Sequence, residues 1–147
     1  MKKDWYNQKV LVGAKTGRTI GFPTVNLSPE KLIGNFEEGV YTCVIKYQGN
    51  KYPGVLYFGP RLVKGEKHPV LEIHILHFNQ EIYGEKIEFS LGKFIRGVMN
   101  FSSMEELKEQ IEKDIKLTLK KNIVYYSHGR RNSRIRYFES YRKYKQA

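Results

Sequence analysis

Four segments rich in β-branched and aromatic residues follow one another with short links, and they limit the fold more than any other feature of the sequence. The segments are residues 39–47, 51–58, 69–77 and 83–91. Such composition is typical of strands. Parallel strands need a crossover of a dozen or more residues, whereas antiparallel strands can be joined by a tight turn. We therefore expect a mainly β chain in which an antiparallel sheet closes into a small barrel.

Local patterns agree with this interpretation. Gln48-Gly49-Asn50 separates the first two segments and is typical of a hairpin. Residues 9–12 are a further strand candidate, and the glycines of residues 13–22 predict a loop. Residues 69–77 alternate in character, so that one face of this strand carries Leu71, Ile73 and Ile75.

A helix is expected after the strands. Apolar residues recur there at helical intervals, at Met104, Leu107, Ile111, Ile115 and Leu119. Its start has the spacing of a capping box in two registers, Ser102 with Glu105 or Ser103 with Glu106. The fold class predicted from the sequence is thus a barrel followed by one or two C-terminal helices.

Length and composition exclude several classes of protein. The 147 residues suit one domain. No apolar run approaches the roughly 18 residues that a membrane-spanning helix needs, and no secretory signal is expected at the N-terminus. Cys43 is the single cysteine, so an internal disulfide is excluded and a reducing cytoplasm is the expected compartment. We expect a monomer.

The charge predicts anionic partners. The formal net charge is +11, with 26 basic and 15 acidic residues. Residues 128–147 hold seven of the basic residues and one acid, Glu139. Two interpretations of this tail remain open, an arm whose tyrosines and arginines contact nucleic acid and an amphipathic helix packed on the barrel. We favour packing, with residues 1–127 forming the barrel and its helix, because the tail has an apolar stripe of Ile135, Phe138, Tyr141 and Tyr144.

The stretch GRTIGFPTVNL, residues 17–27, is the main functional candidate. In residues 13–19, which overlap its start, glycines such as Gly13 leave backbone amides accessible to an anion, and Lys15 and Arg18 add positive charge. The spacing differs from that of a P-loop, so this would be a phosphate-binding loop of another kind. Thr24 and Asn26 share one side if the chain is extended there, and their oxygens suit Mg²⁺. The alternative is a glycine turn leading into a half-exposed strand.

Several motifs in order resemble the riboflavin kinase (flavokinase) family. Gly21-Phe22-Pro23-Thr24-Val25-Asn26 differs by one residue from the family's hallmark Gly-Phe-Pro-Thr-Ala-Asn. The further matches are Gly39-Val40-Tyr41, Leu71–Leu76, Tyr83-Gly84, Ile95-Arg96 and Phe101. The resemblance covers roughly residues 9–116. In bacteria this module is often the C-terminal half of a bifunctional FAD synthetase.

The resemblance implies a fold, a reaction and a set of site residues. The fold would be a six-stranded antiparallel barrel of Greek-key type with a C-terminal helix. The reaction would be ATP- and Mg²⁺-dependent phosphorylation of the riboflavin 5′-hydroxyl to FMN. By position, Glu72 would be the catalytic base, Thr24 and Asn26 would hold the metal, and Arg96 would contact the flavin. The residues that would contact ATP are Gly13, Lys15, Arg18, Thr24, Ile75, His77 and Tyr83.

Two alternatives concern the strand that carries Glu72. An acid in a half-exposed strand is often only an outward-facing charge. A zinc site made of Glu72, His74 and His77 is rejected, because His77 would point to the opposite face of the strand.

The sequence also departs from the family pattern. Residues 58–63 lack the family's Gly-x-x-Pro-Thr, and Val98 replaces an acid associated with flavin contact. The second hypothesis is therefore a catalytically weakened flavin- or nucleotide-binding protein whose basic tail contacts nucleic acid.

Overall fold

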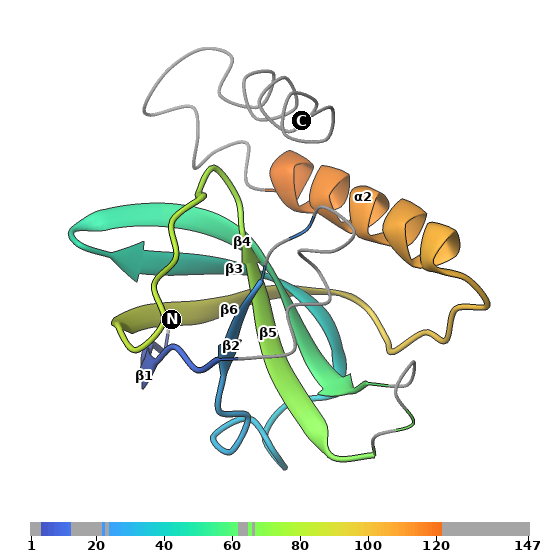
Figure 1. Cartoon of the computed structure of the whole chain (residues 1–147), viewed down its shortest axis with the longest axis horizontal. Coiled ribbons are helices and arrows are strands. Elements are labelled where there is room, and N and C mark those ends of the chain that lie inside the picture. The colour runs from blue at the N-terminus through green and yellow to red at the C-terminus, as the bar shows by residue number, and fades with distance from the viewer. Residues whose placement is uncertain (1–3, 13–21, 23, 62–64, 66, 122–147) are drawn as a thin grey trace.

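The computed structural model describes residues 4–12, 22, 24–61, 65 and 67–121. They form six strands and a helix (Figure 1). The strands are β1 (Tyr6–Lys9), β2 (Val25–Leu27), β3 (Gly39–Tyr47), β4 (Asn50–Pro60), β5 (Pro69–Ile75) and β6 (Lys86–Arg96). The helix is α2 (Met104–Lys121). In the part of the chain so described, no helix is long and apolar enough to cross a membrane.

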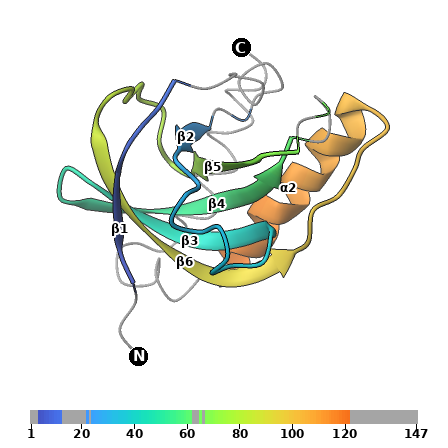
Figure 2. The ribbon, with the colours of Figure 1, turned by 90° about the horizontal axis from the view of Figure 1, so that it is seen from below.

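The strands form one antiparallel sheet that curls into a barrel (Figures 1 and 2). Their order is β1-β6-β3-β4-β5-β2, in which β6-β3-β4-β5 is a Greek key. The chain beyond β1 reaches across to β2, where the Leu11 amide donates a 2.8 Å hydrogen bond to the Asn26 carbonyl. This bridge brings the two edges of the sheet together, and the predicted six-stranded barrel is confirmed.

Turns fix where the strands begin and end. Tyr47 pairs with Asn50, so the β3–β4 hairpin has a two-residue loop in which Gln48 and Gly49 both have positive φ angles. The expected strand at residues 69–77 ends early, at Ile75, because His77 adopts a left-handed φ of 62°. The first strand is displaced from the expected residues 9–12 to β1, and β6 begins later and ends later than the expected 83–91.

The barrel interior is the main hydrophobic core. On β5 the residues that point into this core are the predicted Leu71, Ile73 and Ile75, while Glu72 and His74 point outward. Cys43 is buried there, and burial raises the pKa of its thiol, which leaves it unreactive. The interior residues from the three central strands are Tyr41, Cys43, Ile45, Tyr47, Leu56, Phe58, Leu71, Ile73 and Ile75.

A second core lies between the outer surface of the barrel and α2, which crosses the sheet in Figure 2. Its buried members are Phe22, Val40, Val55, Leu76, Ile115 and Leu119. The helix begins in the second of the two expected registers. The Glu106 amide donates to Ser103 Oγ at 3.2 Å, and the Glu106 carboxylate accepts from the Ser102 amide at 3.1 Å.

Candidate active site

Cross-strand pairing aligns the proposed site residues in a row on the outer surface of the barrel. Asn26 of β2 pairs with Glu72 of β5, and Glu72 pairs with Tyr57 of β4. Tyr57 pairs with Val40 of β3, which in turn pairs with Arg96 of β6. The neighbours of these residues along β2, β4 and β5 point into the barrel, so the row lies on the face that α2 partly covers.

The Arg61 guanidinium links the side chains of Asn26 on β2 and Glu72 on β5. Its Nε and Nη2 donate to Glu72 Oε1 at 3.1 and 2.7 Å, and Nη2 also donates to Asn26 Oδ1 at 3.0 Å. The side chains of Arg61 and Glu72 are 22% and 25% exposed, so the ion pair is partly shielded from water. The acid on β5 is therefore held in place and is not a solvated surface charge.

Tyr57 stands beside Glu72 in the row and fixes the end of β4. Its hydroxyl donates a short hydrogen bond to the Pro60 carbonyl, one residue before Arg61. Burial, and then the negative charges of Glu72 and Glu38, raise the pKa of Tyr57 to about 12. The hydroxyl is therefore protonated at neutral pH and acts as a hydrogen-bond donor.

Arg96, the expected flavin contact, is engaged by the helix. Its Nε and Nη2 bind the carboxylate of Asp114 at 3.0 and 2.9 Å, and Nη1 donates to the Gly97 carbonyl. Asp114 is almost fully buried and also accepts from Gln110. Arg96 thus ties the end of β6 to α2, and a contact with flavin stays a prediction.

Val98 lies against the end of β4. A Cβ added to Gly59 would come within 2.9 Å of Val98 Cγ2 and 3.3 Å of the Tyr57 hydroxyl. The absence of a side chain at Gly59 therefore allows the segment after β6 to approach Tyr57. An apolar side chain thus stands close to the row at the position where the family has an acid.

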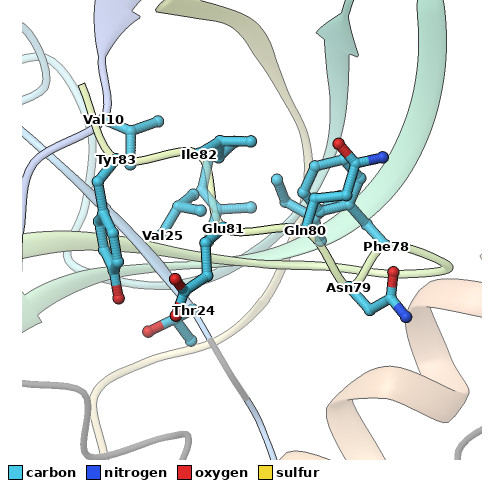
Figure 3. A pocket seen from close by; sticks show the side chains of 11 residues that line it. Val10, Thr24, Val25, Phe78, Asn79, Gln80, Glu81, Ile82 and Tyr83 are labelled. Carbon is cyan, nitrogen blue, oxygen red and sulfur yellow. The ribbon is translucent and has the colours of Figure 1, made fainter. Parts of the chain in front are cut away.

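A cavity of about 260 Å³ opens at one end of the barrel (Figure 3). Three of the expected ATP-binding residues, Thr24, Ile75 and Tyr83, line it together with Val10, Val25 and Ile73. Residues 78–82 form the rest of its wall. The hydroxyls of Thr24 and Tyr83 and the carboxylate of Glu81 lie on the same side in Figure 3. The cavity therefore combines apolar walls with a polar rim, as small-molecule sites commonly do.

His77 does not line this cavity. It is exposed, yet the surrounding protein lowers its pKa to about 4 by desolvation. A contact of His77 with ATP stays a prediction.

Hard oxygen atoms are the metal ligands that this site offers. The amide oxygen of Asn26 is buried beside Glu72, and the half-buried Thr24 hydroxyl lies at the cavity. Within the described ranges, no group of three His, Cys, Asp or Glu residues could hold a metal. Such oxygens suit a hard divalent cation, and a metal held by Asn26 and Thr24 stays a prediction.

Some predictions cannot be compared with the structure, and two residues were missed. Gly13, Lys15, Arg18 and the tail at 128–147 lie outside the described residues. Arg61 and Tyr57 were not predicted as site residues. The alternation along β4 places Tyr57 outside the barrel, but only the β4–β5 register shows that it adjoins Glu72.

Comparisons with known proteins identify the family of this chain. The family model for riboflavin kinase (Flavokinase) matches residues 5–122. The bifunctional riboflavin kinase/FMN adenylyltransferase of Buchnera aphidicola is 42% identical over 115 residues, 76% of this chain and 36% of that protein. The trifunctional protein RibF/MnmA of Mycoplasmoides gallisepticum is 40% identical over 110 residues, 75% of this chain and 17% of that protein. The chain thus corresponds to a minor part of both relatives.

A solved structure shows the same fold. Riboflavin kinase from Trypanosoma brucei matches with a TM-score of 0.59 at 20% sequence identity. The match covers 80% of this chain and 78% of that one. At this identity the likeness shows the fold alone.

Proposed function

Because this chain belongs to the riboflavin kinase family, we propose that it transfers the terminal phosphoryl group of ATP to the 5′-hydroxyl of riboflavin. The 5′-oxygen forms a bond to the γ-phosphorus, the bond from that phosphorus to the bridging oxygen breaks, and ADP leaves. The hydroxyl proton passes to a base, and FMN is the product. Positioning and neutralisation of charge supply most of the rate in such reactions.

The pairing of Asn26 with Glu72 carries this proposal. It brings an amide oxygen suited to a metal ion next to a carboxylate suited to be a base. In this scheme Glu72 accepts the proton of the riboflavin hydroxyl, and Asn26 with Thr24 holds Mg²⁺. Bound Mg²⁺ neutralises negative charge on the phosphates.

The cavity supplies the place for the nucleotide. Its apolar walls at Ile75 and Val10 and the ring of Tyr83 suit a purine base, and Thr24 at its rim faces the phosphates. We assign the glycine loop, with Gly13, Lys15 and Arg18, to the phosphates. His77 lies outside this cavity, and no contact with the nucleotide is assigned to it.

The other end of the row is assigned to riboflavin. Arg96 holds the segment with Val98 at the end of β4 through its bonds to Asp114 and the Gly97 carbonyl. Val98 offers the flavin an apolar surface in place of an acid. If the loss of the acid lowers the affinity for riboflavin, catalysis would be weakened. Such a loss would favour the second hypothesis, a catalytically weakened binding protein.

The test is incubation with riboflavin, ATP and Mg²⁺, followed by chromatography for FMN. Formation of FMN that requires all three supports the kinase. If FMN does not form but calorimetry shows that riboflavin or ADP binds, the binding protein is favoured. A parallel titration with RNA at physiological salt then tests whether the basic tail contacts nucleic acid.

A further inference from the structure

A single guanidinium connects the two side chains that the proposed function assigns to the metal and to the base. We propose that Arg61 is a positioning residue that fixes the Glu72 carboxylate and competes with the bound metal ion for the amide oxygen of Asn26. This inference rests on the proposed function. It adds a coupling, in which the arrival of the metal changes how the base is held.

The contacts with Glu72 favour positioning over simple charge pairing. Both Nε and Nη2 of Arg61 donate to the same oxygen, Oε1. Among the described residues no other hydrogen bond reaches the Glu72 side chain. Two donors from the rigid plane of a guanidinium hold Oε1 in place. Oε2 is thereby left to accept the proton of a substrate hydroxyl.

The backbone beside Arg61 is also fixed. Pro60 ends β4 in register with Pro69, and its carbonyl accepts the hydroxyl of Tyr57. Tyr57 is itself the cross-strand partner of Glu72. The backbone of Arg61 is therefore fixed beside the strand that carries Glu72. Less conformational entropy is then lost when the guanidinium is held against the carboxylate.

The hydrogen bond from Arg61 to Asn26 is the contact that couples metal binding to the position of the base. Nη2 donates to Oδ1, the atom of Asn26 that would bind a metal ion. A carbonyl oxygen has two lone pairs, but a guanidinium and a divalent cation on the same oxygen repel each other. Metal binding therefore weakens the bond from Arg61 to Asn26 and keeps the bonds from Arg61 to Glu72. Conversely, removal of the guanidinium should strengthen metal binding.

A salt bridge with only a structural role would behave differently. Its loss would lower the melting temperature, and metal binding would weaken or stay unchanged as the site loosened. The proposal predicts opposite signs for two quantities, tighter metal binding together with slower turnover. Opposite signs are not expected from partial unfolding.

The experiment compares Arg61→Gln and Arg61→Lys with the wild type. Calorimetry gives the Kd of ADP with saturating Mg²⁺ and with EDTA, and the ratio of the two measures the contribution of the metal. Turnover to FMN gives kcat and the KM for riboflavin. Lys31→Gln is the control, because it removes one positive charge from an exposed position in the turn after β2.

For Arg61→Gln we expect the contribution of Mg²⁺ to ADP binding to rise about threefold to tenfold, the range that the net strength of one typical competing hydrogen bond gives. We expect kcat to fall about 10- to 100-fold through misplacement of the base, with KM changed by about twofold or less. Arg61→Lys keeps the positive charge but loses the planar pair of donors. The contribution of Mg²⁺ to ADP binding should therefore return towards the wild-type value, while kcat stays low. The control should match the wild type.

An unchanged or smaller metal contribution in Arg61→Gln overturns the proposal, whatever happens to kcat. The two claims can fail separately. If the wild type makes no FMN but the metal contribution rises in Arg61→Gln, the competition at Asn26 stands and the proposed reaction fails. If the wild type makes FMN and Arg61→Gln matches it in both quantities, only the role of Arg61 is refuted.

Discussion

The ion pair between Arg96 and Asp114 should determine how firmly α2 is held to the barrel. Asp114 is 2% exposed and receives three hydrogen bonds from Arg96 and one from Gln110. Removal of one partner of a buried ion pair costs about 3–5 kcal/mol, because the other charge is left buried. Arg96 is 15% exposed and can be partly hydrated, so we expect the lower end, about 3 kcal/mol, for Asp114→Ala.

Thermal and urea unfolding measure this loss. At about 3 °C per kcal/mol for a chain of this size, Asp114→Ala should lower Tm by roughly 10 °C. Glu109→Ala, which removes an exposed acid from the same helix, should change stability by about 0.5 kcal/mol or less. A double variant with apolar residues at positions 96 and 114 should recover part of the loss. If Asp114→Ala costs less than about 1 kcal/mol, the ion pair does not anchor the helix and Arg96 can serve the flavin instead.

Three further predictions follow from single contacts. Thr24→Ala should weaken calorimetric binding of MgADP while Tm is kept, and an unchanged Kd would remove Thr24 from the metal site. Ser103→Ala should cost about 1 kcal/mol through loss of the helix cap, and a stability equal to the wild type in urea would contradict that. The raised pKa of Tyr57 means that the folded state keeps a proton that the unfolded state loses between about pH 10 and pH 12, so stability should fall as pH rises through this window. The fall should be shallower in Tyr57→Phe, and identical slopes would refute the assignment.

The sequence predicted the elements of the fold better than their ends. The hairpin at Gln48-Gly49 and the helix from Met104 were predictable because turn chemistry, capping and apolar period are local signals. The end of β5 was not predictable, because the left-handed His77 interrupts a pattern that continues to alternate. The closure through Leu11 and Asn26 depends on strands far apart in the sequence.

The candidate site shows the same division. Alternation placed Glu72 outside the barrel, and the resemblance to the family pointed to Asn26 and Thr24 as metal ligands. Nothing in the local sequence around Arg61 indicates that its guanidinium reaches two other strands. Such contacts depend on register and on the path of the chain after β4, and both are tertiary properties.

The most direct test of the account is the single-turnover rate of FMN formation by the wild type and by Glu72→Gln. The variant keeps the shape of the side chain but cannot accept a proton as a carboxylate does. We expect a rate about 10²- to 10⁴-fold lower, with ADP and riboflavin bound about as tightly as in the wild type. A variant that makes FMN at nearly the wild-type rate would contradict the claim that Glu72, held beside Asn26, is the base of this reaction.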